Sequence, residues 1–227
     1  NHKNISFMYL YLGTCPGMMG MALSMIIRTE MINTNNYFNN QFYYMTITTH
    51  AFIMIFFMTM PIIIGTFSNW LIPLMISSQD LIYPRMNNLS LWLLTPSLTL
   101  MMLSLIINNS INTGWTLYPP LANQNNISIN FIILSLHLNG ASSIMSSLNF
   151  IMSIMFMKPK NMFLMNITLF NWSIIITSLL LIFSIPVLAS AITMILLDQN
   201  FSTMFFNPYG NGNPIIFQHL FWFFGHP

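Results

Sequence analysis

The sequence predicts an all-α fold, a polytopic bundle of transmembrane helices with five complete helices and the start of a sixth. Charged residues make up only 4% of the 227 residues, whereas soluble domains carry about 25%. Hydrophobic residues make up 55%, and the mean hydropathy is +0.67. Several apolar runs reach the roughly 20 residues that a helix needs to cross a bilayer. We therefore expect residues 1–227 to form a single truncated transmembrane domain in a lipid bilayer.

The apolar runs favour helices over strands. Backbone groups in lipid must be hydrogen-bonded within the protein, so spanning segments are either helices or members of a closed barrel. Barrel strands alternate apolar and polar residues over about 10 positions. The runs at 53–60 and 174–182 do not alternate in this way.

The expected elements follow the apolar runs in chain order. The spans are 6–27, 42–75, 90–107, 131–157 and 172–197, and a sixth begins near residue 214. The second run is longer than a bilayer requires, so we expect it to tilt or protrude. The connections are rich in Asn, Gly and Pro, as is typical of turns; they are 33–40, 108–114, 119–126 and 207–214.

The few charges predict an orientation. Four of the five basic residues fall in aqueous segments that share one face of the bundle: Lys3, Arg85, Lys158 and Lys160. Arg28 lies in the segments of the other face, with Glu30 and Asp198. The positive-inside rule then puts the N-terminus on the cytoplasm-equivalent side. The basic residues are too few and too scattered for nucleic-acid binding.

Two histidines are candidate metal ligands. His50 lies inside the second span, where a charged side chain would cost about 2.5–3.5 kcal/mol. A neutral imidazole there suits haem iron or another metal, although an interhelical hydrogen bond would also explain it. His226 lies in an aromatic stretch beside Pro227 and is a weaker candidate, because a metal site needs several ligands. We interpret His137 and His219 as structural or hydrogen-bonded, and His2 as solvated.

A polar stripe marks the fourth span. At 100° per residue, its members fall within an arc of roughly 120°; they are Ser135, Asn139, Ser142, Ser143, Ser146 and Asn149. Small polar residues often hold helices together. They could also wall a water-filled proton path, and Asp80, the only acid on the positive face, could then collect protons at its mouth.

Several motifs resemble one known family. The segments 49–57, 69–74, 84–88, 114–120 and 218–227 resemble the cytochrome c oxidase subunit 1 family of haem-copper oxidases. The resemblance covers the whole chain but only the N-terminal part of the family's length. It implies the catalytic subunit of the terminal respiratory oxidase, which reduces oxygen to water with electrons from cytochrome c and pumps protons.

The resemblance also implies cofactors, partners and a location. The expected cofactors are haem a, haem a3 and copper B, and the expected partners are other oxidase subunits, notably the copper A subunit, with cytochrome c as electron donor. The expected location is the mitochondrial inner membrane, with the N-terminus on the matrix side. Further haem and copper ligands would lie beyond Pro227, so we expect activity only from the full-length subunit in its complex.

Individual residues match family positions. His50 matches a ligand of the haem a iron, and His226 matches a ligand of copper B. Arg28 and Trp115 match residues beside haem a. Seven residues match a proton pathway: Asp80 at its entrance, then Asn69, Asn87, Tyr9, Ser142, Ser143 and Asn149.

The chain also departs from the family's pattern. Thr66, Ser68 and Asn139 replace smaller residues of the family, so packing near them must adjust. Two alternatives stay open. A quinol-oxidising relative would share the ligands and differ in its electron donor. A cofactor-free transporter or structural helix bundle would need no metal, but carriers often show internal repeats, and none is evident.

Overall fold

The computed structural model of the chain describes residues 1–32, 38–107, 111, 113–123, 126–160 and 162–226. These residues form helices and connecting segments, and none of them is in a β-strand. The main helices are α1 (His2–Ile32), α2 (Asn40–Phe52), α3 (Asn69–Met75), α4 (Pro84–Ile107), α5 (Ile127–Phe156), α6 (Leu169–Asn200) and α7 (Pro214–Gly225). Short 3-10 turns are η3 (Leu121–Asn123), η4 (Leu164–Asn166) and η5 (Pro208–Gly210).

The predicted all-α class and the predicted spans are confirmed. Five helical segments are long and apolar enough to cross a membrane: His2–Ile32, Asn40–Met75, Pro84–Ile107, Ile127–Phe156 and Leu169–Asn200. Each extends the corresponding predicted run by a few residues, and α7 begins at the predicted Pro214. The chain is therefore a multi-span membrane protein by length and composition of its helices.

The second span changes its helical form along its length. Between α2 and α3 it contains two π-helical stretches, η1 (Ile53–Thr59) and η2 (Pro61–Ser68). Pro61 lacks a backbone N–H and so interrupts the α-helical ladder between them. The hydroxyls of Thr59 and Thr66 donate to the carbonyls five residues earlier, those of Met54 and Pro61, at 2.7 and 3.3 Å. The wider turn of a π-helix changes which side chains share a face.

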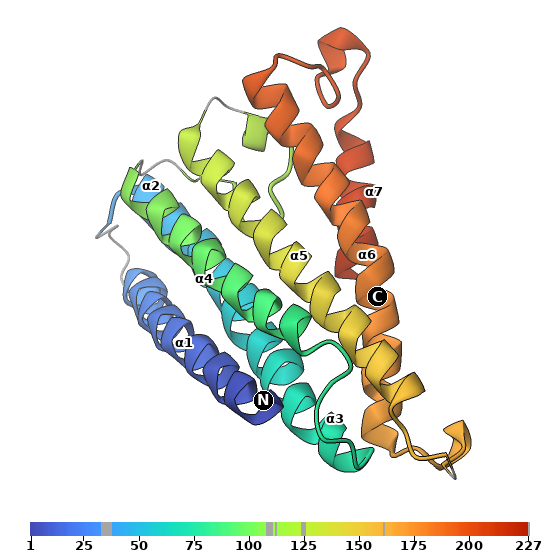
Figure 1. Ribbon diagram of the computed structural model, residues 1–227. Helices are drawn as coiled ribbons and strands as arrows, with labels where there is room; N and C mark the ends of the chain where they lie inside the picture. Colours follow the sequence, from blue (N-terminus) through green and yellow to red (C-terminus); the bar gives the residue numbers. More distant parts are fainter. Residues whose placement is uncertain (33–37, 108–110, 112, 124–125, 161, 227) are drawn as a thin grey trace.

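The helices form a bundle in which most helices pack against a neighbour in sequence (Figure 1). α4 packs against α5, α5 against α6, α6 against α7, and α1 against the second span. The N-terminus lies at the same end of the bundle as the segments at 76–83 and 157–168, and the segment at 201–213 lies at the opposite end. This agrees with the predicted alternation, in which most basic residues share one end.

Small hydroxyl residues join α4 to α5. Ser97 and Ser135 donate to each other's backbone carbonyls, both at 2.7 Å, and both side chains are fully buried. Part of the predicted polar stripe is thus interhelical hydrogen bonding, where each bond contributes on average about 0.6 kcal/mol.

The three residues expected to replace smaller ones, Thr66, Ser68 and Asn139, are accommodated in different ways. The Asn139 amide donates to the carbonyl of Phe56 at 3.0 Å and so joins α5 to η1. Thr66 turns its hydroxyl back onto its own helix. The hydroxyl of Ser68 is buried with no hydrogen-bond partner among the described residues.

Candidate functional site

His50 links the second span to α1. Its Nδ1 lies 2.8 Å from the backbone carbonyl oxygen of Gly20, and the side chain is half-buried. A carbonyl oxygen only accepts hydrogen bonds, so Nδ1 carries the proton and the lone pair of the neutral ring is on Nε2. The contact needs α1 close by: a Cβ added at Gly20 would lie 2.5 Å from the Met54 sulfur. Metal-binding histidines commonly hold their second nitrogen in this way.

In the described structure, neither Arg28 nor Trp115 makes a hydrogen bond or ring contact to His50. Arg28 is exposed and lies two turns beyond Gly20 on α1, about 12 Å along the helix at 1.5 Å per residue. Trp115 is half-buried and packs edge-on against two rings of α7, with centroid distances of 5.4 Å to Phe221 and 6.0 Å to Trp222. The structure therefore connects Trp115 to the last helix.

The other histidines differ in their surroundings. His226 is exposed at the end of α7, and its backbone N–H donates to the Trp222 carbonyl. His219 is also exposed. Both ring nitrogens of His137 have partners, the Ile133 carbonyl at 2.7 Å and the Thr193 hydroxyl at 2.9 Å, which agrees with the structural interpretation of this residue.

The described part of the chain contains no group of three His, Cys, Asp or Glu side chains that could hold a metal ion. His226 is therefore not accompanied by further ligands within these residues.

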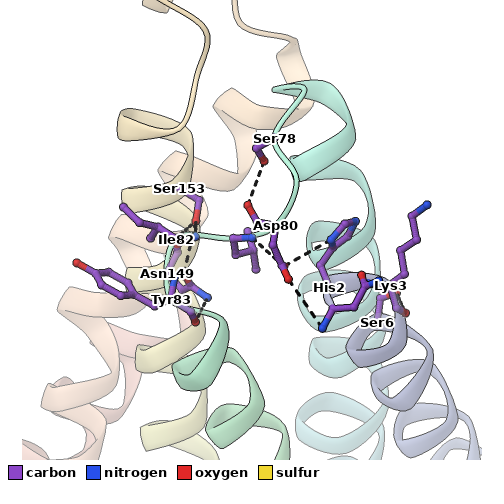
Figure 2. A network of polar contacts seen from close by, with 11 residues as sticks. His2, Lys3, Ser6, Ser78, Asp80, Ile82, Tyr83, Asn149 and Ser153 are labelled. Carbon is purple, nitrogen blue, oxygen red and sulfur yellow. Dashed lines mark hydrogen bonds and ion pairs between the residues drawn. The ribbon is translucent and has the colours of Figure 1, made fainter.

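Asp80 lies in the segment between α3 and α4, at the basic end of the bundle (Figure 2). Its side chain is 32% exposed, and its Oδ1 accepts a hydrogen bond from the N–H of Leu81 at 2.8 Å. The Nδ1 of His2 lies 3.5 Å from the same carboxylate. The expectation that His2 is solvated is wrong: only 5% of the residue is exposed, because the first turn of α1 packs beside this segment.

A line of hydrogen bonds runs from α1 into α4 and α5. Tyr9 is buried, and its hydroxyl lies 2.7 Å from that of Ser90. Ser90 donates to the Asn87 carbonyl at 2.7 Å, so Tyr9 is the donor in the first contact. The Ser142 hydroxyl donates to the Ser90 carbonyl at 2.6 Å.

Two buried asparagines have unused polar atoms. Neither amide atom of Asn87 has a hydrogen-bond partner in the described structure, and both are buried. Asn69 donates to the Gly65 carbonyl at 2.6 Å, but its Oδ1 has no partner there. Buried polar atoms are usually satisfied by protein or by ordered water, so these atoms favour hydration of this part of the bundle.

Two cavities meet at α5. The smaller, about 20 Å³, is lined by Tyr9, Ser142, Ser143, Ser146 and Asn139 together with apolar side chains. This is enough room for one water molecule beside several polar groups. The larger, about 180 Å³, lies between the second span, α5, α6 and α7. Ser143 and Asn139 line both cavities, although the Ser143 hydroxyl itself donates to the Asn139 carbonyl at 3.0 Å.

Asn149 differs from Asn69 and Asn87 because its side-chain oxygen and nitrogen both have hydrogen-bond partners. It is fully buried, and its amide contacts the backbone of Tyr83 through both polar atoms, at 3.1 and 3.2 Å. Asn149 therefore contacts the segment between α3 and α4 that carries Asp80 (Figure 2).

The hydrogen bonds of the predicted polar residues thus gather at the basic end and along α5, whereas His50 is bonded to α1 and Trp115 packs against α7. The sequence interpretation missed Ser90, which joins Tyr9 to Ser142. A signal was present, because Ser90, Ser97 and Ser104 recur every seven residues and all three are fully buried. It also missed His2, whose proximity to Asp80 is a tertiary contact without a local pattern.

Comparisons with known proteins find similarity along the whole chain. The family model described as cytochrome c and quinol oxidase polypeptide I matches residues 4–227. The chain is 48% identical over 232 residues to a protein of Mytilus edulis named cytochrome c oxidase subunit 1, and 42% identical over 233 residues to one of the same name in Eremothecium gossypii. All of the chain is covered in both alignments, but only 42% and 44% of these relatives. The chain therefore spans less than half the length of the curated relatives that it matches.

Proposed function

The chain belongs to the cytochrome c and quinol oxidase polypeptide I family, and from this premise we propose that the whole protein is the catalytic subunit of a terminal respiratory oxidase. It reduces oxygen to water with electrons from cytochrome c and couples this reaction to proton pumping. Residues 1–227 supply part of one transmembrane domain. The names of both relatives support cytochrome c as the donor, whereas the family's description also includes quinol oxidases.

The family implies haem and copper cofactors, and His50 is the residue of this chain that best fits one. Its Nδ1–H is held by the Gly20 carbonyl, which leaves Nε2 in the form that a metal requires. We assign His50 to the iron of haem a, with Arg28 and Trp115 beside that group. The haem, when bound, transfers single electrons. The protein fixes the tautomer and orientation of the imidazole, and the apolar bundle keeps water away from it.

His226 is proposed as a ligand of copper B. Because the described residues form no group of three candidate ligands, its partners, like the ligand of haem a3, would come from other parts of the whole protein. The proposed partner subunits include the one that carries copper A, and the proposed location is the mitochondrial inner membrane with the N-terminus on the matrix side.

The polar residues of α3, α4 and α5 are proposed as a proton pathway. Protons are collected by the partly exposed Asp80 and pass along water near Asn69 and Asn87, whose unused amide atoms can bind it. Beyond them lie Tyr9, Ser142 and Ser143, which line the small cavity. Asn149 supports the entrance.

Oxygen consumption and proton release of the assembled oxidase test this proposal. The wild-type complex should oxidise reduced cytochrome c, and Asp80→Asn should slow proton uptake. Oxidation of a quinol but not of cytochrome c would contradict the choice of donor. Unchanged uptake in Asp80→Asn would contradict the pathway.

A further inference from the structure

The segment between α3 and α4 is held by two side chains of α5 (Figure 2). The Oδ1 of Asn149 accepts from the N–H of Tyr83 at 3.1 Å, and its Nδ2 donates to the carbonyl of the same residue at 3.2 Å. One turn later, the hydroxyl oxygen of Ser153 accepts from the N–H of Ile82 at 3.0 Å. Ser153 in turn donates to the Asn149 carbonyl at 2.6 Å. Three hydrogen bonds therefore fix two successive backbone units.

These contacts supply a hydrogen-bond acceptor that the backbone of Tyr83 would otherwise lack. Tyr83 precedes Pro84, the first residue of α4, and a residue before proline is disfavoured in helical conformation. Its N–H therefore has no place in the helical ladder, while its carbonyl already accepts from Asn87 at 3.1 Å as the first turn of α4. Asn149 supplies the missing acceptor.

The three asparagines of the proposed pathway therefore differ in what they can bind. A primary amide offers one acceptor oxygen and two N–H donors. Asn87 has both amide atoms unused, and Asn69 has its oxygen unused. Asn149 already uses its oxygen and one of its two N–H donors on Tyr83.

We infer that Asn149, supported by Ser153, is a positioning residue for Asp80, while Asn69 and Asn87 are the asparagines that contact pathway water. The inference rests on the proposed role of Asp80 in collecting protons. Asp80 lies two residues before Ile82, and its carboxylate is bonded to the N–H of Leu81 in between. The conformation of 80–83 sets where this carboxylate lies relative to His2, 3.5 Å away.

Hydrogen exchange of the assembled, full-length oxidase tests the contact itself. Asn149→Ala and Ser153→Ala should each lower the protection of the amides in 81–83 by roughly three- to ten-fold, as expected for the loss of one or two hydrogen bonds. Ser147→Ala is the matched control, because Ser147 is a fully buried hydroxyl of α5 that donates only to the Ser143 carbonyl of its own helix. Unchanged protection in both test variants would overturn the inference, and Ser153→Ala keeps the test available if Asn149→Ala fails to assemble.

Asn149→Asp provides a rescue experiment. An ionised carboxylate keeps the acceptor for the Tyr83 N–H but loses the donor to the Tyr83 carbonyl, whereas a protonated carboxyl restores a donor. Protection at 81–83, corrected for intrinsic exchange, should therefore recover as the pH falls in Asn149→Asp and not in Asn149→Ala. The same low protection at every pH in both variants would contradict the paired contact.

Proton uptake separates positioning from mere folding. In Asn149→Ala the rate of uptake should fall at least three-fold and its pH profile should shift, while Ser147→Ala matches wild type. Faster exchange with unchanged uptake and an unchanged pH profile would overturn the positioning role. Asp80→Asn distinguishes the two proposals: normal uptake in that variant contradicts the pathway, whatever the exchange results show.

Discussion

Gly65→Ala should displace the buried Tyr9 and disturb the junction of α1, η2 and α4. A Cβ added at Gly65 would lie 2.4 Å from Cδ1, 2.8 Å from Cγ and 2.9 Å from Cε1 of the Tyr9 ring. Carbon atoms pack best at roughly 3.5–4.0 Å, so the ring would have to move by about 1 Å. Only 2% of Tyr9 is exposed, and its hydroxyl is bonded to Ser90 at 2.7 Å, so the ring cannot move without losing that bond.

The expected cost combines two effects. Overpacking a well-filled site costs about 1–3 kcal/mol, and the lost hydrogen bond adds about 1 kcal/mol. The free energy of unfolding of the full-length subunit, measured in mixed micelles, should therefore fall by about 2–4 kcal/mol. Gly140→Ala is the control with a smaller expected loss, because its Cβ would meet a single methyl group of Ile185 at 3.0 Å.

A double-mutant cycle identifies the cause. In a Tyr9→Ala background the ring is absent, so Gly65→Ala should be nearly neutral, and the coupling energy should reach at least about 1 kcal/mol. If Gly65→Ala costs the same in both backgrounds, the close contact with the tyrosine ring is not the reason for the glycine.

Two further predictions concern the bundle and the extent of the chain. Ser97→Ala should lower the free energy of unfolding by about 0.6 kcal/mol, because it removes a donor from the reciprocal pair with Ser135; no loss would show that these bonds do not hold α4 against α5. The isolated chain of residues 1–227 should show no oxygen turnover in an oxygen-electrode assay even when supplied with haem and copper, because it spans less than half the length of its relatives. Measurable turnover would contradict that expectation.

The spans were predictable because each depends on a property that is local in the sequence. Long apolar runs and the alternation of charges agree with the bundle. Much of the predicted connections at 33–40, 108–114 and 119–126 lies outside the residues that the structure describes. The boundaries extend beyond the apolar runs because the first turns of α1 and α4 are polar yet helical. The π-helical form of η1 and η2 was not predictable, since Pro61 alone is compatible with a simple kink.

The candidate site was predictable in its residue types but not in its pairings. The Ser and Asn stripe of α5 is visible at helical spacing, yet nothing local distinguishes Asn149, which holds Tyr83, from Asn139, which holds the Phe56 carbonyl. The partner of His50, a glycine carbonyl 30 residues away, is a tertiary contact that no spacing rule contains. Such pairings depend on how α1, α4 and α5 approach one another.

We propose that the imidazole of His50 holds haem iron in the whole protein. The most direct test is the visible absorption spectrum of the purified full-length oxidase carrying His50→Ala, with His137→Phe as control, since both ring nitrogens of His137 already have partners within the bundle. We expect His50→Ala to lose the low-spin haem signal and His137→Phe to keep it. An intact low-spin signal in His50→Ala would contradict the assignment.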